Sequence, residues 1–181
     1  MSEVHEQPKI PKSRHHTIRE ARHEDIPLLA DVERSAAKLF TYFNVPVDDS
    51  VVDLSLLTSM LQDHHLWVAV DDEDKPVGFL GGFKVDDNFH VAEVSVKKDN
   101  QRQGIGNSLM YRMMKDIKEE GFPAITLTTN QILPFNRPWY QSLGYIELEA
   151  KDIGNELTLL IEEESNHLDN NLRCAMRKNI L

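Results

Sequence analysis

A loop with two glycines, Gly104 and Gly106, separates a predicted strand from a predicted amphipathic helix. Glycines allow a ligand to approach the main chain closely, and the first-turn amides of a helix have no partners within the helix. The helix dipole adds partial positive charge at the same place, so such a loop is suited to a pyrophosphate group. The alternative is purely structural, because the two glycines could simply allow a tight junction between strand and helix.

Two other phosphate-binding motifs do not fit this loop. The dinucleotide fingerprint requires Gly or Ala three residues after Gly106, where the chain has Leu109. The Walker A motif requires Gly-Lys followed by Ser or Thr, and no such sequence follows the glycines. A pyrophosphate bound here would therefore be held by a motif of another kind.

The elements around the loop predict one mixed sheet with helices on its faces. Short polar turns separate three apolar segments, which predicts an antiparallel meander over 66–70, 77–85 and 89–96. Helices and strands are then expected to alternate: helix 104–120, strand 124–129, helix 137–143, strand 145–150, helix 155–164 and strand 172–178. A strand over 17–22 and helices over 26–40 and 53–61 are expected before the meander. This order predicts an α/β (α+β) fold.

Length and composition predict one acidic domain. The 181 residues carry 20 Lys and Arg against 30 Asp and Glu, so the net charge of −10 argues against nucleic acid as a ligand. The longest apolar run, 77–83, is too short to cross a membrane, and the lone Cys174 cannot form an internal disulfide. We therefore expect a cytoplasmic protein with no membrane partner. Residues 1–16 have few apolar side chains and are predicted to be a flexible tail before a single domain, 17–181.

The segment Gln101-Arg102-Gln103-Gly104-Ile105-Gly106 resembles the Gln/Arg-x-x-Gly-x-Gly/Ala motif of the GNAT (GCN5-related) N-acetyltransferases, where it binds the coenzyme A pyrophosphate. Downstream, Tyr140-Gln-Ser-Leu-Gly144-Tyr145 resembles the family's Tyr-x-x-Leu-Gly-Phe/Tyr. The resemblance covers roughly residues 17–178 and is strongest over 89–147. It implies a GNAT-like, mostly antiparallel sheet with a splayed strand pair at the cofactor site, and acetyl-CoA as co-substrate.

A bacterial subgroup of this family is more closely similar. Its motifs His-x-x-x-x-Ser-Val, Leu-Thr-Thr, Pro-x-Asn and Arg-x-Ala-Met-Arg correspond here to 90–96, 127–129, 134–136 and 173–177. Two positions depart from the family pattern. Lys98 replaces a common proline, and Asn136 lies four residues before Tyr140, where seven is more usual. Asn136 is therefore a candidate pantetheine contact or, at this spacing, the N-cap of the helix that follows.

Direct transfer of an acetyl group to an amine needs a base for the amine, a polarised carbonyl and a proton for the departing thiolate. The resemblance implies Tyr140 as the acid, and a core aromatic residue is the alternative. Glu93 and His90 are the candidate bases, or else a solvated strand carboxylate and a packed histidine. An ideal strand points them to opposite faces, whereas a bulge, common on this strand in the family, would change that.

The resemblance also implies a set of coenzyme contacts. A main-chain N–H near Val94 or Val96 would be the oxyanion donor, with no side chain required. The predicted coenzyme-binding residues are Val94, Ser95, Val96, Gln101, Arg102, Gln103, Gly104, Ile105, Gly106, Asn107, Ser108 and Asn136. No metal is predicted, because the pairs 15–16 and 64–65 lack the spacing of a helical zinc site.

The acceptor is expected to be a small amine, and its identity is not encoded in these motifs. Residues 48–99 contain 12 Asp and Glu against 4 Lys, a net charge of −8 that would attract a cation, although most of it lies in turns. A protein amine is the lesser alternative. A second class of function is a noncatalytic acyl-CoA-binding or protein-interaction module, with 162–169 docking a partner. The C-terminal strand and helix often meet a partner subunit in this family, which is compatible with a homodimer.

Overall fold

The computed structural model describes residues 15–44, 50–131, 133–167 and 173–181, with no side-chain description for 165–167. Most of the predicted tail, 1–14, lies outside the described residues. The elements are β1 (Thr17–Glu20), α1 (Ile26–Ala37), η1 (Phe40–Phe43), α2 (Leu54–Gln62), β2 (Leu66–Val70), β3 (Pro76–Val85), β4 (Asn88–Val96), η2 (Lys98–Asn100), α3 (Ile105–Glu119), β5 (Ala124–Asn130), α4 (Asn136–Ser142), β6 (Ile146–Glu147), η3 (Ala150–Asp152), α5 (Asn155–His167) and β7 (Arg173–Asn179).

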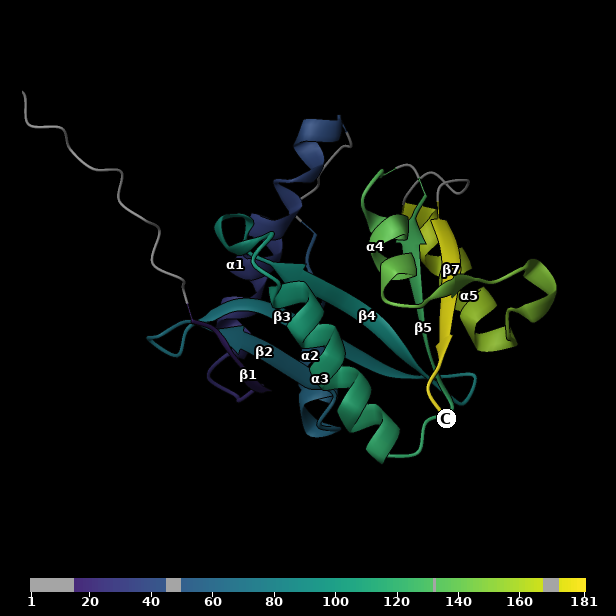
Figure 1. The fold of residues 1–181 in the computed structure, drawn as a ribbon, viewed down its shortest axis with the longest axis horizontal. Coiled ribbons are helices and arrows are strands. Elements are labelled where there is room, and N and C mark those ends of the chain that lie inside the picture. Colours follow the sequence, from purple (N-terminus) through teal and green to yellow (C-terminus); the bar gives the residue numbers. More distant parts are fainter. Residues whose placement is uncertain (1–14, 45–49, 132, 168–172) are drawn as a thin grey trace, which may run out of the picture.

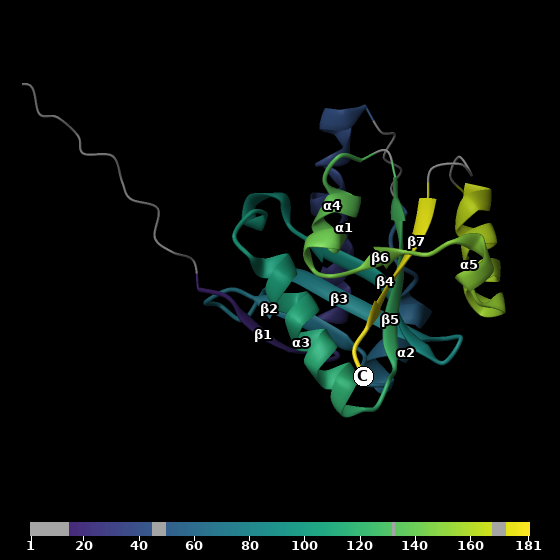
Figure 2. The same ribbon diagram turned by 45° about the vertical axis from the view of Figure 1, so that its right-hand side comes forward.

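Seven strands form one sheet in the order β1-β2-β3-β4-β5-β7-β6. Every neighbouring pair is antiparallel except β4 and β5, which run parallel. The predicted mixed, mostly antiparallel sheet flanked by helices is therefore confirmed. Figure 1 shows α3 crossing one face of the sheet with α1 and α2 behind it, and Figure 2 shows α5 beside β7.

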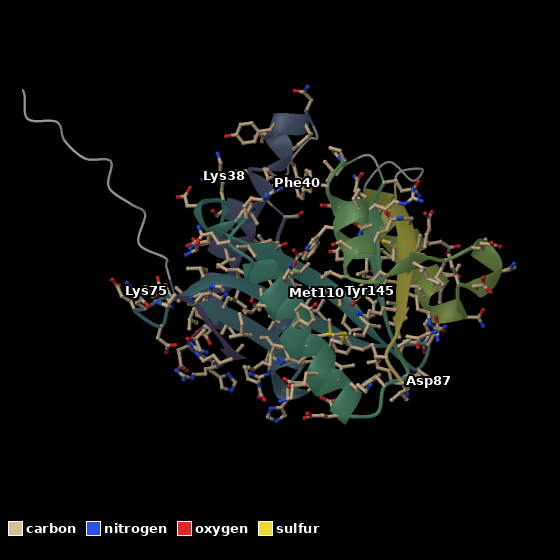
Figure 3. All side chains as sticks on the ribbon, viewed as in Figure 1. Lys38, Phe40, Lys75, Asp87, Met110 and Tyr145 are labelled. Carbon is tan, nitrogen blue, oxygen red and sulfur yellow. The ribbon has the colours of Figure 1, made fainter. Side chains whose placement is uncertain are left out.

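Two main apolar clusters lie on opposite faces of the sheet. On one face the apolar stripe of α3, which includes Leu109 and Met113, packs against Trp67 and Phe89 of the strands. On the other face α1 and α2 pack against the neighbouring strand residues, among them Phe79. Figure 3 places Met110 of α3 beside Tyr145, and both belong to the first cluster. Burial of these side chains fixes α3, and with it the glycine loop, at the edge of the parallel strand pair.

A bulge interrupts β4 opposite two glycines of β3. Gly81 pairs with Glu93 and Gly82 pairs with Val91, so Ala92 is the extra residue on β4. A Cβ atom at Gly82 would lie 2.2 Å from the main-chain oxygen of His90, a distance that no side chain can occupy. Glycine at this position therefore allows the close approach that the bulge requires.

Two predicted elements are shorter than the sequence suggests. The periodic segment 26–40 ends as an α-helix at Ala37 and is followed by the 3-10 helix η1, closed by Asn44 in the left-handed conformation. The strand predicted over 145–150 pairs with β7 through Ile146 and Glu147, and the Leu148 amide adds a hydrogen bond to the Ala175 carbonyl before the chain turns into η3. Within the described part of the chain, the helices are too short or too polar to cross a bilayer.

Candidate active site

The glycine loop enters α3 through two residues with positive φ. Arg102 has φ 62° and Gly104, the N-cap residue, has φ 80°. Alternation between left-handed and right-handed conformations turns successive N–H groups toward one side, which forms an anion-binding concavity. The amides of the first turn of α3, from Ile105 onward, add donors that a helix cannot satisfy internally. The loop thus provides the main-chain arrangement that a pyrophosphate requires.

Side chains of the loop hold its own main chain. The Gln101 side-chain amide donates to the Val96 carbonyl at 2.9 Å, and that of Gln103 donates to the Asp99 carbonyl at 3.1 Å. The Ser108 hydroxyl donates to the Gly104 carbonyl at 3.1 Å. Contacts from these positions to a ligand would therefore come from main-chain amides, while the side chains keep the loop in shape.

The strands β4 and β5 separate beside this loop. Their parallel pairing runs from Phe89 with Ile125 to Val91 with Leu127 and then stops, although β4 continues to Val96. Figure 1 shows the two strands meeting near their N-terminal ends and diverging toward the side of α4. The divergence begins at the bulge and leaves the main chain of 94–96 without β5 as a partner. This is the splayed strand pair that the resemblance implies.

The bulge brings Glu93 and His90 to the same face of the sheet. Phe89 and Val91 before it, and Val94 after it, all pack on the side of α3. His90 and Glu93 therefore both lie on the side of α1 and α5. The structure thus contains the bulge that was needed for both candidate bases to reach one site.

Glu93 is half-buried at the point where β4 leaves β5. Its carboxylate accepts a hydrogen bond from the Ser95 hydroxyl at 2.6 Å. Burial raises the pKa of Glu93, while that hydrogen bond and the nearby Arg173 oppose the rise. A carboxylate with a raised pKa is a better proton acceptor for an amine than an ordinary one.

His90 is buried, with 1% of its surface exposed. Its Nδ1 lies 3.0 Å from the Thr126 hydroxyl, and its Nε2 has no hydrogen-bond partner among the described residues. Burial, with a contribution from Arg173, lowers the pKa of His90 to about 4. The imidazole is therefore neutral at pH 7.

Tyr140 is held at the C-terminal end of α4 by a glycine cap. The Gly144 amide donates to the Gln141 carbonyl and the Tyr145 amide donates to the Tyr140 carbonyl, which is a Schellman motif with Gly144 at φ 88°. The Gly-Tyr end of the motif Tyr-x-x-Leu-Gly-Tyr is therefore the cap that ends α4. Burial raises the pKa of Tyr140, and the charge of Glu93 raises it further, so the phenol is protonated at neutral pH and can donate a proton.

An ion pair behind these groups was not predicted from the sequence. Arg173 at the start of β7 lies 2.8 Å from the Glu164 carboxylate, and its Nη2 donates to the Thr128 hydroxyl at 2.8 Å. The same hydroxyl donates to Glu164 at 2.7 Å. The charge of Arg173 acts on Glu93, His90 and Tyr140 alike. The only sequence signal was that Arg173 begins the Arg-x-Ala-Met-Arg motif.

Two predicted roles need correction or refinement. Asn136 is the first residue of α4 and Phe135 precedes it as the N-cap without a capping side chain, so the N-cap interpretation of Asn136 is wrong. The helix begins one residue earlier than the position of Pro138 suggested. The side chain of Asn107 accepts a hydrogen bond from the Trp139 indole at 2.7 Å, which leaves its main-chain amide as the group available to a ligand.

A groove of about 340 Å³ borders the loop on its outer side. Asn100, Gln103 and Ile105 form one wall, and the acidic turn 71–73 forms another. Its walls include neither Glu93 nor Tyr140. The groove is thus distinct from the divergence of β4 and β5.

Comparisons with known proteins agree with this geometry. Residues 62–147 match the family described as acetyltransferase (GNAT) domain. Human N-acetyltransferase 8B is 31% identical over 85 residues, which span 44% of this chain and only 37% of that protein. A GNAT-family acetyltransferase of Staphylococcus aureus Mu50 superposes with a TM-score of 0.73 at 19% identity, covering 92% of this chain and all of the other.

A solved structure with coenzyme A also shares the fold. It is the PaiA N-acetyltransferase of Thermoplasma acidophilum, with a TM-score of 0.69 at 15% identity over 91% of this chain and 99% of the other. The glycine loop, the splayed strands and the Tyr-x-x-Leu-Gly-Tyr cap all fall within or directly beside the matched segment. The chain therefore has the fold of the GNAT structures, and its residues 62–147 match the GNAT acetyltransferase domain.

Proposed function

We propose that the protein is an acetyl-CoA-dependent N-acetyltransferase that transfers acetyl directly to the primary amine of a small cationic molecule. The observation that carries this proposal is the placement of Glu93 on β4, just past the point where β4 separates from β5, and of buried Tyr140 on α4, near enough for the charge of Glu93 to raise the pKa of Tyr140. One group accepts protons and the other donates them, and both lie next to the glycine loop. A module that only bound acyl-CoA would need the loop and the gap alone.

The residues that would hold the coenzyme fit its chemistry. The positive-φ residues Arg102 and Gly104 and the first turn of α3 present main-chain donors, and a Cβ at Gly104 would meet nothing within 4 Å. Space and donors thus coincide at one place, as a pyrophosphate requires. When bound, acetyl-CoA supplies an acetyl group activated as a thioester. The main-chain N–H groups of 94–96 beside the gap would polarise its carbonyl.

Two residues of the chain would then each transfer one proton. Glu93 accepts a proton from the amine as its nitrogen forms a bond to the acetyl carbon. Tyr140 donates its phenolic proton to the sulfur as the carbon–sulfur bond breaks, which yields the amide and a free thiol. Proton transfer from Glu93 to Tyr140, directly or through solvent, restores both groups. Neutral His90, whose Nε2 has no hydrogen-bond partner among the described residues, lies on the same side of the sheet as Glu93, where it would orient the amine or a water molecule.

Release of free thiol from acetyl-CoA across a panel of primary amines tests this proposal. We expect turnover with at least one cationic amine, and a decrease in kcat of about 10²-fold or more for Tyr140→Phe and for Glu93→Gln, the scale of a lost general acid or base. Tyr111→Phe is the matched control, because Tyr111 is an exposed tyrosine on α3. Binding of coenzyme A without turnover would favour the noncatalytic module instead.

A further inference from the structure

Glu33 is a second carboxylate at this site, supplied by α1 rather than by the sheet. It is half-buried, and its Oε2 accepts a hydrogen bond from the Val52 main-chain N–H at 3.0 Å. Helix α1 packs against β3 and β4, and the Ser35 hydroxyl lies 3.2 Å from the Lys98 amide just beyond β4. Glu33 also lies one helical turn after the fully buried Leu29, so its side chain is on the side of α1 that faces the sheet.

Glu33 and Glu93 interact with each other across that space. Burial raises the pKa of Glu33 to about 7, and the charge of Glu93 is the second cause of the rise. The cations that act on the pair are already engaged with other acids. Arg34 lies 3.4 Å from Asp31, and Arg173 is paired with Glu164. Arg34, which acts on Glu33, and Arg173, which acts on Glu93, are therefore each shared with another acid.

Buried His90 is an independent indication that a ligand or a water molecule binds here. The Nε2 of His90 is buried and has no partner in the described part of the chain. A buried polar atom without a partner is costly, and it commonly marks a place for a ligand or water. His90 lies on the same face of β4 as Glu93. Two carboxylates and a neutral imidazole together favour donors such as ammonium or amine N–H groups.

An aromatic cluster joins η1, which follows α1, to the residue that precedes α4. Phe40 begins η1, three residues after α1 ends at Ala37. Its ring stacks on Phe135, with centroids 6.5 Å apart, and Phe43 contacts the same ring at 5.1 Å. Figure 3 shows Phe40 at the base of η1, on the side toward α4. These rings can cover methylene groups, and their faces attract cations.

We propose that the acceptor is a diamine, whose reacting nitrogen lies at Glu93 while its second ammonium group is held by Glu33. The inference rests on the proposed function, because it assigns the acceptor of that same site. Glu33 is the residue that distinguishes a diamine from a monoamine. The aromatic rings of Phe40 and Phe135 would contact the carbon chain between the two nitrogens.

Steady-state kinetics with matched amines tests the proposal. Butane-1,4-diamine and butylamine differ only in the second amine, and 4-aminobutan-1-ol replaces that amine with an uncharged polar group. We expect kcat/KM for the diamine to exceed that for either monoamine at least tenfold. Glu33→Gln should lower kcat/KM for the diamine at least tenfold more than for butylamine, chiefly through KM. Glu119→Gln, an exposed acid on α3, should leave the preference intact.

A binding measurement separates this inference from the proposed function. Calorimetry with coenzyme A-saturated protein measures diamine binding without any transfer. Tighter binding of butane-1,4-diamine than of butylamine, lost in Glu33→Gln, supports the inference even if no amine is acetylated. Equal affinity of the wild-type protein for both amines overturns it, and so does an equal loss for both amines in Glu33→Gln.

Discussion

The indole Nε1 of Trp139 donates a hydrogen bond to Asn107 Oδ1 over 2.7 Å, and this contact joins α4 to the first turn of α3. The same indole ring lies over Gly106, where a Cβ atom would approach it to 3.1 Å. Trp139 directly precedes Tyr140, and their rings are 4.7 Å apart. The proposed acid and the proposed pyrophosphate site are therefore linked by one side chain.

Trp139→Phe is expected to weaken this link while retaining an aromatic ring over Gly106. An exposed hydrogen bond contributes about 0.5–1 kcal/mol, so we expect the affinity for coenzyme A to be about twofold to fivefold weaker. Asn107→Ala should have a similar effect, and the double mutant should lose less than the sum of the two losses. Ser142→Ala is the control, since the Ser142 hydroxyl donates to the Trp139 carbonyl within α4 and not to α3. Additive losses would show that the two residues are not coupled.

Gly104→Ala tests whether the left-handed residue at the start of α3 serves the ligand. An Ala with positive φ costs about 1 kcal/mol of stability. Gly121→Ala is a matched control, because Gly121 has φ 89° and also has nothing within 4 Å of an added Cβ. Denaturant unfolding should give similar losses for both variants. Only Gly104→Ala should weaken coenzyme A binding, by about tenfold, because its methyl group would occupy the space of the phosphate. Equal affinities for the two variants would contradict the assignment.

Glu33 should make the stability of the folded protein depend on pH. Its pKa is about 7 in the folded protein, against 4.5 for an ordinary glutamate. The folded state therefore binds this proton more tightly than the unfolded state, so the contribution is complete below pH 4.5 and is lost as the pH rises through 7. After allowance for partial exposure, we expect a loss of about 1–2 kcal/mol. Other groups titrate over the same range, so the comparison needs a variant that lacks only this one.

Thermal unfolding of Glu33→Gln at pH 5 and pH 8 isolates that contribution. Relative to the wild type, the variant should gain about 1–2 kcal/mol between the two pH values, or about 2–8 °C in Tm. Glu119→Gln, an exposed acid on α3, should show a much smaller difference. If the difference in stability between the wild type and Glu33→Gln is the same at both pH values, Glu33 is solvated and far from Glu93.

Local sequence patterns were sufficient for much of the fold. The alternation over the meander, the glycine loop and the caps at Gly121 and Gly144 depend on short-range chemistry, and the structure has the corresponding elements. Contacts between distant segments could not be read in this way. The Asp86 carboxylate, in a hairpin turn, accepts hydrogen bonds from the Glu156 and Leu157 amides at the start of α5. No local pattern indicates a cap supplied from 70 residues away.

The same distinction applies to the candidate site. Glu93, His90 and Tyr140 lie in motifs, and their surroundings could be anticipated once a bulge was assumed. Glu33 lies in a helix where one charged residue among several looks like part of a solvated face. Only the packing of α1 on β4 sets Glu33 apart from Asp31 and Arg34. The contacts of Arg173 could not be predicted either, because its partners Glu164 and Thr128 come from other elements.

Isothermal titration calorimetry of the purified protein with acetyl-CoA measures the central claim most directly, since every proposed step depends on binding at the loop and the splayed strands. We predict saturable binding of one molecule per chain, with a Kd in the micromolar range that is weakened by Gly104→Ala and unaffected by Gly121→Ala. The absence of any binding heat with acetyl-CoA and with coenzyme A, at several temperatures, would contradict the account.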